Sequence, residues 1–290
     1  MTYPAVPPRP HQLTVDASNT INDDLEMWIP FTDQNIFGQG ATDISGNGRN
    51  AMVVDTSVIE QGSFIDADRG ACFYQNTTTA GVQVGLLTND LNMPLNQTDG
   101  FTTSIWVKHY TTDVAYEQIW DAVYNAGGTA NQNYQTYRDV FGGRFNAWKK
   151  TGKRSITSIT DPYMVSTSNT WYHLVTRCDN NEFSLWVDNV KIASNSNSTV
   201  PSLDDVNDKL AFGRQGPASQ SQGQPLKGQI QCFRFWSRDL SDAEIGQLYN
   251  DPWVGSNYTA TSGGAGGAGA SYFKPIRWNK SEDGLNIRRL

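Results

Sequence analysis

Cysteine and long apolar runs are both scarce in this sequence. The three cysteines, Cys72, Cys178 and Cys232, are far apart and include no C-x-x-C pair, which argues against a disulfide framework and against a zinc site. We therefore expect three buried thiols outside any disulfide. No apolar run reaches the roughly 18 residues that a membrane-spanning helix needs. The first ten residues hold no apolar segment, so we expect no signal peptide and a protein made in the cytoplasm.

Glutamate and histidine are also scarce, which bears on catalysis. Six of the 29 acidic residues are Glu, and these six are isolated from one another. The three histidines, His11, His109 and His173, are too scattered to indicate a catalytic triad or a metal cluster. His173, within a Trp-Tyr-His segment, is predicted to be a packed strand residue. The net charge of −7 argues against nucleic acid as the main partner.

The abundant residues favour strands and turns. The chain has 26 glycines and many Asn, Thr, Ser and Asp residues, which suit the turns between short strands. Asp188 and Asn189 form a two-residue turn of the type that tolerates a positive φ. Many short strands and one terminal helix indicate an all-β, antiparallel two-sheet sandwich. We predict strands over residues 101–107, 118–124, 139–148, 171–177, 183–187 and 190–192.

One late segment changes from strand to helix. Residues 229–236 alternate polar and apolar like a strand with one buried face, although the alternation leaves open whether Cys232 or Phe233 points inward. Ser241 and Glu244 then form a capping box, and apolar residues at helical spacing follow until an Asp-Pro pair ends the helix. A helix of about two turns is unstable alone, so it has to pack on a folded domain.

Composition divides the chain into four parts. Residues 1–20 begin with four prolines in ten positions and are expected to form an extended arm. Residues 21–254 carry the strand pattern and form the domain, and residues 255–271 are a linker of Gly, Ala and Ser. Residues 272–290 form a basic and aromatic tail, with five basic and two acidic residues. The tail residues predicted to anchor the chain are Tyr272, Phe273, Arg277, Trp278, Arg288 and Arg289.

Five motifs in order resemble those of a known family. They are Asp-Ile-Ser-Gly-Asn-Gly at 43–48, the strand at 101–107, Trp-Tyr-His at 171–173, Leu-Trp-Val-Asp-Asn at 185–189, and the strand–helix segment at 228–249. Together they resemble the laminin-G-like, concanavalin A-like jelly-roll domains. The resemblance implies two curved antiparallel sheets, frequently a calcium ion at one rim, and frequently glycan or protein binding. Such domains occur in matrix proteins, lectin-like modules and virion proteins.

A calcium site is one expectation. Asp43, Ser45 and Asn47 offer hard oxygen ligands in a glycine-containing turn, as calcium prefers. The alternative is a turn in which these side chains merely close a loop. Calcium-binding relatives often carry an acidic residue after the Gly-x-Ile of the last strand. This chain has the neutral Gln231 there, which weakens a divalent site.

A glycan site is the second expectation, because exposed aromatic rings stack on sugars. The alternative is that these aromatic residues fill the core and its edges. Related glycosidases carry two carboxylates on one strand as E-x-D-x-x-E, which this chain lacks, so we expect no catalytic residues and no enzyme. The predicted glycan-binding residues are Trp120, Asp121, Tyr134, Tyr137 and Trp148, from the least regular part of the domain.

Three functional hypotheses follow from these observations. The first is a non-enzymatic structural or decoration protein of a virus particle, in particular a bacteriophage, assembled in the host cytoplasm. Its arm and tail would bind other virion proteins, and its lectin-like jelly-roll would bind cell-surface glycans, without nucleic acid or membrane insertion. The alternatives are a stand-alone carbohydrate-binding module of a cellular protein and an enzyme that acts on polysaccharide.

Overall fold

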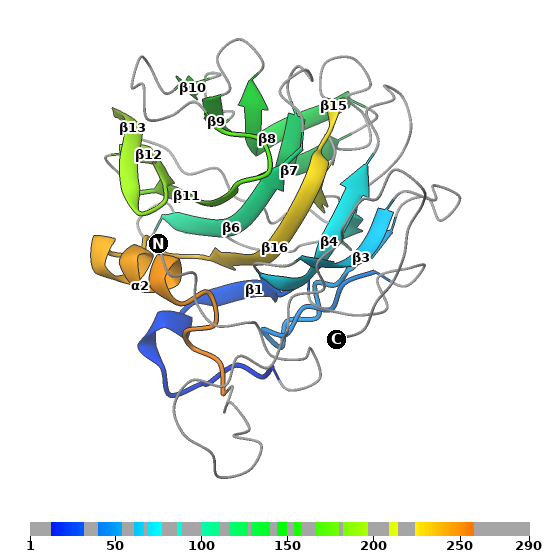
Figure 1. Ribbon diagram of the computed structural model, residues 1–290. Coiled ribbons are helices and arrows are strands. Elements are labelled where there is room, and N and C mark those ends of the chain that lie inside the picture. Colours follow the sequence, from blue (N-terminus) through cyan, green and yellow to red (C-terminus); the bar gives the residue numbers. More distant parts are fainter. Residues whose placement is uncertain are drawn as a thin grey trace, which may run out of the picture. The chain divides into compact units, whose positions relative to one another are not determined.

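The computed structural model of the 290-residue chain describes most of the domain (Figure 1). All described residues belong to a first unit of residues 1–258, and residues 259–290 form a second unit. The described residues are 13–31, 40–53, 61–66, 69–76, 86–88, 100–110, 117–126, 129–139, 144–149, 154–157, 166–179, 182–196, 209–213 and 224–257.

The first sheet contains the strands predicted over residues 101–107, 171–177, 183–187, 190–192 and 229–236. Its members are β1 (Leu25–Ile29), β3 (Gln61–Asp66), β4 (Gly70–Asn76), β6 (Phe101–His109), β11 (Trp171–Cys178), β12 (Glu182–Val187), β13 (Val190–Ser196) and β16 (Lys227–Trp236). Their order is β13-β12-β11-β6-β16-β4-β3, and β1 pairs with β16. The predicted turn joins β12 to β13, with φ angles of 49° at Asp188 and 65° at Asn189.

The second sheet lies above the first in Figure 1. Its members are β2 (Ala51–Val53), β5 (Leu86–Thr88), β7 (Glu117–Ala126), β8 (Thr129–Asp139), β9 (Arg144–Lys149), β10 (Arg154–Thr157), β14 (Lys209–Phe212) and β15 (Gln224–Pro225). Their order is β10-β9-β8-β7-β14-β5-β2. Strand β15 pairs with β7 in parallel, and the other described pairs are antiparallel. The single strand predicted over 139–148 is wrong, because Asp139 ends β8 and Arg144 begins β9.

The core lies between the two sheets, as the alternating patterns predict. Ile105 and Val107 of β6 and Ile230 of β16 point toward this core, where they meet Leu210 and Phe212 of β14. Aromatic rings join the layers, and the Phe212 and Phe233 ring centroids lie 4.7 Å apart in an edge-to-face arrangement. The fold is therefore the antiparallel two-sheet jelly-roll sandwich that the sequence predicts.

A β-bulge settles which residue of β16 points inward. The register with β6 shifts between Gln231 and Arg234, and Cys232 has a φ of 54°. This extra residue leaves Phe233 in the core between the sheets and places Cys232 on the outer face of the first sheet. All three cysteines are buried thiols, as predicted.

Helix α2 (Asp242–Asn250) forms where the sequence predicts it. Ser241 is its N-cap, and the capping box is complete, with the Ser241 backbone N–H donating to Glu244 Oε2 at 2.8 Å. Ile245 and Leu248 are buried against the outer face of the first sheet, together with Trp236. A short 3-10 helix, η2 (Thr20–Asn22), lies in the segment before β1.

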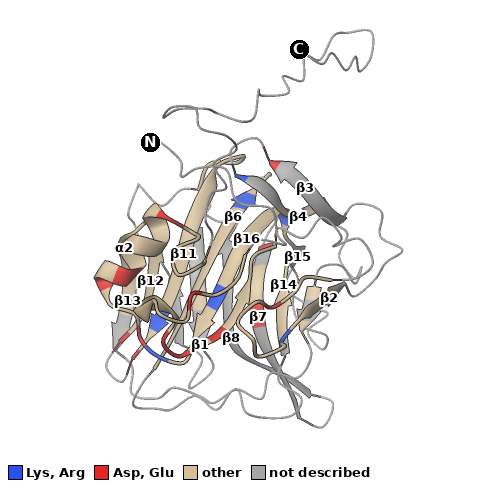
Figure 2. Cartoon of the chain, turned by 90° about the horizontal axis from the view of Figure 1, so that it is seen from below, with Lys and Arg blue, Asp and Glu red and all other residues tan. Residues whose placement is uncertain are grey.

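The outer face of the first sheet is buried as well, so the domain has a third layer. Leu13 and Trp253 cover this face beside Trp28, Trp106 and Trp171. Seen from below, α2 lies against the strands of the first sheet (Figure 2). Eight of the nine residues of β6 are consequently buried, so neither face of this strand is exposed to solvent.

Candidate functional site

The turn after Asp43 holds its carboxylate in place with protein donors. Asp43 Oδ1 accepts hydrogen bonds from the backbone N–H groups of Trp28 (2.9 Å) and Ser45 (3.0 Å). Its Oδ2 accepts from the Arg49 N–H (3.0 Å) and the Ser45 hydroxyl (2.9 Å). The Asn47 side-chain amide donates to backbone carbonyls of β1 at 2.9 and 3.3 Å. The turn thereby fastens the loop to β1.

These residues fit the structural turn better than a calcium site. Both oxygens of Asp43 already accept two hydrogen bonds, which a calcium ion would have to displace. Arg49 forms an ion pair with Glu26 at 3.0 Å and adds a positive charge next to the turn. Within the described segments, no three His, Cys, Asp or Glu residues gather in a way that could hold a metal ion.

Gln231 occupies the position where calcium-binding relatives often have an acidic residue, and it pairs with an arginine. Gln231 Oε1 accepts from Arg69 Nε at 3.0 Å, and Gln231 Nε2 donates to the Arg69 carbonyl oxygen at 2.9 Å. The Arg69 guanidinium stacks over Trp106, 3.6 Å from the ring centroid. A buried cation therefore lies where a divalent metal would need negative charge.

A second buried arginine joins the end of the domain to the first sheet. Arg234 is fully buried and stacks over Trp28 at 3.4 Å from the ring centroid. Its guanidinium donates to the carbonyl oxygens of Pro252 (2.6 Å) and Val254 (2.8 Å). Burial lowers the pKa of Arg234 from its usual value, because the charged form is desolvated.

A serine–histidine pair on the outer face does not form a catalytic triad. The Ser104 hydroxyl lies 2.8 Å from Nε2 of His173, while Nδ1 of His173 has no hydrogen-bond partner among the described residues. The His173 ring is 1% exposed and stacks on Trp106 at 4.9 Å. Burial, with the charges of Arg69 and Arg234, lowers the pKa of His173 to about 3. The prediction that His173 is a packed strand residue is confirmed.

The predicted glycan-binding residues do not form one described site. Trp120 is 1% exposed and packs on Phe233, and Asp121 is fully buried beside it on β7. Neither side chain is exposed to a sugar. Tyr134, Tyr137 and Trp148 lie on β8 and β9, which pair with each other, but their side chains lie outside what the structure describes.

Tryptophan exposure limits where a sugar could stack. Each tryptophan whose side chain the structure describes is at most 6% exposed. Among the described residues, the accessible aromatic rings are instead those of half-buried tyrosines. These tyrosines are Tyr74, Tyr110, Tyr172 and Tyr249.

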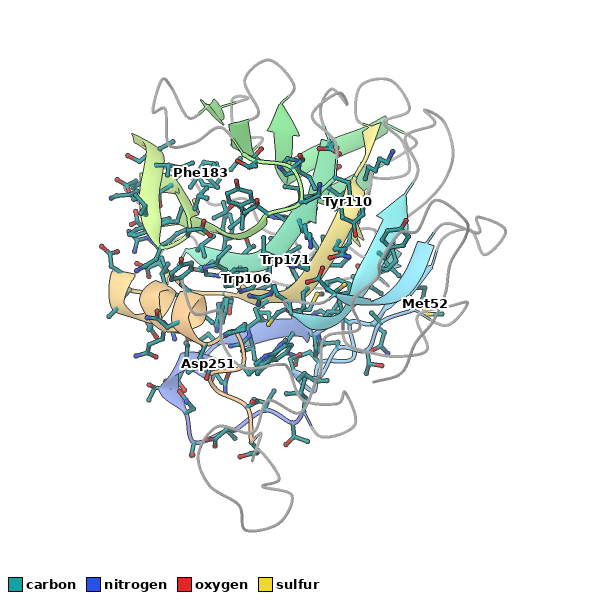
Figure 3. All side chains as sticks on the ribbon, viewed as in Figure 1. Met52, Trp106, Tyr110, Trp171, Phe183 and Asp251 are labelled. Carbon is teal, nitrogen blue, oxygen red and sulfur yellow. The ribbon has the colours of Figure 1, made fainter. Side chains whose placement is uncertain are left out.

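A row of side chains that includes Tyr74 crosses the outer face of the first sheet, and Tyr110 lies beside it. Tyr74 of β4, Gln229 of β16, Lys108 of β6 and Trp171 of β11 are successive cross-strand partners. The Tyr74 and Tyr110 ring centroids lie 5.9 Å apart. Figure 3 shows Tyr110, Trp171 and Trp106 following one another along this sheet. The members of this row come from four separate segments of the chain, so the sequence does not show that they are neighbours.

An aspartate at the end of β3 fixes the charged part of this row. Asp66 Oδ2 accepts from Lys108 Nζ at 2.7 Å, and Asp66 Oδ1 accepts from the Trp171 indole N–H at 2.9 Å. The Arg69 backbone N–H donates to the same Oδ1 at 3.2 Å. The Lys108 side chain is 12% exposed, so this ion pair lies at the boundary between the protein interior and solvent.

The two ends of the described chain lie side by side. Val15 and Ser256 form an antiparallel β-bridge, with the Asp16 N–H donating to Gly255 O (2.8 Å) and the Asn257 N–H donating to Thr14 O (2.9 Å). The Asn22 side-chain amide donates to the carbonyl oxygens of Asp16 and Gly255. Residues 13–20 and 255–257, which the sequence assigns to the arm and linker, are therefore packed on the domain.

The residues predicted to anchor the chain cannot be placed on this structure. Tyr272, Phe273, Arg277, Trp278, Arg288 and Arg289 all lie outside the described residues.

Comparison with known proteins identifies the family. A laminin G-type family model of the concanavalin A-like lectin/glucanases superfamily matches residues 76–246, more than half of the chain. The chain belongs to this superfamily, as the motifs predict. No curated protein matches the sequence.

Solved structures with this fold include several sugar-binding proteins. Domain 4 of the extracellular arabinanase AbnA from Geobacillus stearothermophilus, in complex with arabinotriose, is 17% identical, with a TM-score of 0.54, over 78% of this chain and 98% of that domain. The receptor-binding domain of botulinum neurotoxin D is 15% identical, with a TM-score of 0.57, over 79% and 53%. A Trypanosoma rangeli sialidase in complex with sialic acid is 13% identical, with a TM-score of 0.55, over 79% and 33%. The chain thus spans about half of the toxin domain and a third of the sialidase.

Proposed function

We propose that this protein is a non-enzymatic, lectin-like module that is held on a larger assembly by its two ends and binds glycans. We further propose that the assembly is a virus particle, in particular a bacteriophage, in which the chain is a structural or decoration protein. The lectin-like fold, the engaged carboxylates and the paired ends support this proposal, and the paired ends carry it.

The paired ends mean that both terminal segments continue from one place on the domain. Residues 14–16 and 255–257 are joined by backbone hydrogen bonds, and buried Leu13 and Trp253 pack in the same cluster. The described chain therefore begins and ends at neighbouring points of the domain. A domain attached at a single place can present its remaining surface to a ligand, which suits a displayed module.

The described glutamates support a non-enzymatic role, because each has structural partners. Retaining and inverting glycosidases need two carboxylates that face a substrate across an open site. In this chain the glutamates outside the described residues are Glu60 and Glu282. Glu26 pairs with Arg49 and Ser237, and Glu182 pairs with Lys191. Glu117 is fully buried and accepts from the Lys227 N–H. Glu244 belongs to the capping box and pairs with Arg238.

The solved structures support glycan binding by analogy of fold. The arabinanase domain was solved with arabinotriose, and a botulinum neurotoxin D binding domain was solved with N-acetylneuraminic acid. Both share the sandwich with this chain at low sequence identity. No helix in the described part of the chain is long and apolar enough to cross a membrane.

Incorporation into particles tests the assembly role. The full chain and a version that ends at Asn257 would be expressed in cells that produce the particles, and purified particles would be probed with an antibody against residues 13–257. We expect the full chain in the particles and a loss of at least tenfold for the truncated chain. Equal incorporation of both chains would contradict anchoring through the tail.

A stand-alone carbohydrate-binding module is the second candidate, because the chain matches 98% of one domain of a secreted arabinanase. This alternative predicts that the purified chain is a monomer that binds polysaccharide and is absent from particles. Analytical ultracentrifugation and a glycan array on the same sample distinguish the two candidates. Release of reducing sugar from a bound polysaccharide would contradict both and would favour an enzyme.

A further inference from the structure

We infer that the outer face of the first sheet carries a saccharide site, formed by Tyr74, Tyr110, Gln229, Lys108, Trp171 and Asp66, that prefers acidic sugars. This inference rests on the proposed glycan-binding function and names the surface and the class of sugar. It places the site away from the aromatic residues on β7, β8 and β9 that the sequence suggests.

The residues form a continuous surface because they are neighbours in the sheet. Tyr74, Gln229, Lys108 and Trp171 are partners across four adjacent strands, so their side chains point to the same face. The row ends on β3 at Gly62, which pairs with Tyr74 and has no side chain.

Gln229 supplies the feature that points to a ligand. Its side chain is 1% exposed, yet its Oε1 has no hydrogen-bond partner among the described residues. Leaving a buried acceptor unpaired costs about 1–3 kcal/mol, and most buried polar atoms are paired. The other end of this amide is used, because Gln229 hydrogen-bonds the phenol of Tyr110. A ligand hydroxyl that reaches Oε1 would remove this cost.

The two tyrosines form a boundary that a sugar could enter. Tyr74 and Tyr110 are half-buried, and their ring centroids lie 5.9 Å apart at a tilt of 48°. Aromatic rings with a few convergent polar groups are the usual lining of small-molecule sites. The Tyr110 phenol is protonated at neutral pH like any tyrosine, and burial raises its pKa further. Binding requires these two tyrosine side chains to move, because Gln229 behind them is 1% exposed.

The local charge favours an acidic sugar. Lys108 forms an ion pair with Asp66 at 2.7 Å, and the Arg69 guanidinium lies 5.4 Å from the centroid of the Trp171 ring. Asp66 directs the Lys108 ammonium, which keeps two further N–H donors beyond the one used by Asp66. A sugar carboxylate could accept from these Lys108 donors as an ion pair, which a neutral sugar could not form. Binding should therefore weaken as salt screens the charges.

Calorimetric titration with a matched pair of probes tests the inference. The full chain would be titrated with 3′-sialyllactose and with lactose, which differ by one acidic sugar. We expect sialyllactose to bind at least tenfold more tightly than lactose in 0.15 M NaCl, and to bind more weakly in 1 M NaCl. Equal affinity for the two probes would overturn the preference for acidic sugars.

Substitutions in the row then locate the site. We expect Gln229→Leu and Tyr74→Ala to weaken sialyllactose binding at least tenfold. Gln229→Leu should keep the melting temperature within a few degrees, because removing the unpaired acceptor offsets the loss of the hydrogen bond to the Tyr110 phenol. The matched control is Tyr172→Phe, which should leave binding unchanged. Tyr172 is a half-buried residue of β11, and its hydroxyl accepts from the Thr167 N–H.

The outcomes separate this site from the proposed function. If sialyllactose binds and both row variants bind as tightly as the original chain, the site is wrong while glycan binding stands. If neither probe nor any saccharide on a printed array binds the folded full chain, both the site and the glycan-binding function are contradicted.

Discussion

The two faces of the first sheet are both buried, but by different chemistry. The inner face presents aliphatic and phenylalanine side chains, such as Ile105, Val107 and Phe233, to the second sheet. The outer face presents tryptophans stacked with Arg69 and Arg234. An apolar face needs volume and shape to be filled, whereas the outer face also needs a hydrogen-bond partner for every buried polar atom.

The two faces of this sheet therefore have different roles: the inner face stabilises the domain, and the outer face also carries the proposed ligand site. The inner face is closed once the two sheets meet, because its side chains form the main apolar core. The outer face depends on segments from both ends of the domain, and at Gln229 an acceptor lacks a partner among the described residues. A ligand therefore has more to gain from the outer face than from the inner one.

The largest effect is expected on the inner face, from Phe233→Ala. Phe233 is fully buried and contacts the rings of Phe212 and Trp120 across the sandwich. Removing the ring leaves a cavity and should lower the free energy of unfolding by about 3–5 kcal/mol in urea titrations. Val190→Ala, at a side chain that is 58% exposed, is the control and should change it by less than about 0.5 kcal/mol. A loss below about 1.5 kcal/mol for Phe233→Ala would show that the inner face tolerates gaps.

On the outer face, Arg234→Met should cost slightly less, about 3 kcal/mol. The substitution keeps an apolar chain over Trp28 but removes the donors to the carbonyl oxygens of Pro252 and Val254. An acceptor left buried and unpaired costs about 1–3 kcal/mol. This cost falls mainly on Val254, because the Pro252 carbonyl oxygen also accepts from the Cys232 thiol at 3.0 Å. Limited proteolysis should also cleave faster near residues 251–257, because this segment loses its attachment. Unchanged proteolysis with unchanged stability would mean that packing alone holds the outer layer.

Much of the inner face could be predicted from sequence, because period-two alternation reports which residues share a face. The strands at 101–107, 171–177 and 183–187 were found because their inner residues are apolar and β-branched or aromatic. Strand β8 (Thr129–Asp139) was missed because its polar, Asn- and Gln-rich sequence lacks that pattern. The capping box of α2 was found because it is a local signal between residues three apart.

The outer face could not be predicted, because its contacts join residues far apart in the sequence. Arg69 with Gln231, and Val15 with Ser256, become neighbours only through the strand order. The prediction that Trp120 is an exposed aromatic residue is wrong for a local reason, because the structure buries its side chain. A bulge in β7, between Gln118 and Trp120, accompanies its burial in the core. A single residue added to a strand changes its face, and composition does not report it.

An intermediate effect is expected from acid, through His173 on the outer face. Its folded-state pKa is about 3, lowered by burial and by Arg69 and Arg234, against an unfolded value of 6.5. The unfolded chain therefore binds a proton below about pH 6.5 that the folded chain does not bind until about pH 3. Its contribution is fully present above pH 6.5 and is lost as the pH falls, by about 2 kcal/mol at pH 5.

Urea titrations at pH 7 and pH 5 test this expectation against His173→Gln. Glutamine can still hydrogen-bond the Ser104 hydroxyl but does not titrate, so the variant should lose about 2 kcal/mol less between the two pH values. Parallel losses in the two proteins would assign the acid sensitivity to other groups.

The smallest effect is expected at the edge of the outer layer, from Ser241→Ala. The substitution removes the hydroxyl that accepts from the Glu244 N–H at 3.3 Å, and N-cap losses cost about 1 kcal/mol. The helix should remain, because Ile245 and Leu248 stay buried on the first sheet and packing stabilises a short helix more than its cap does. Hydrogen exchange should therefore speed up in the first turn of α2 and not in its last turn. Ser18→Ala, which removes an exposed hydroxyl that donates to Asp16, is the control. If both variants lost the same stability, the capping box would not contribute specifically to the stability of the outer layer.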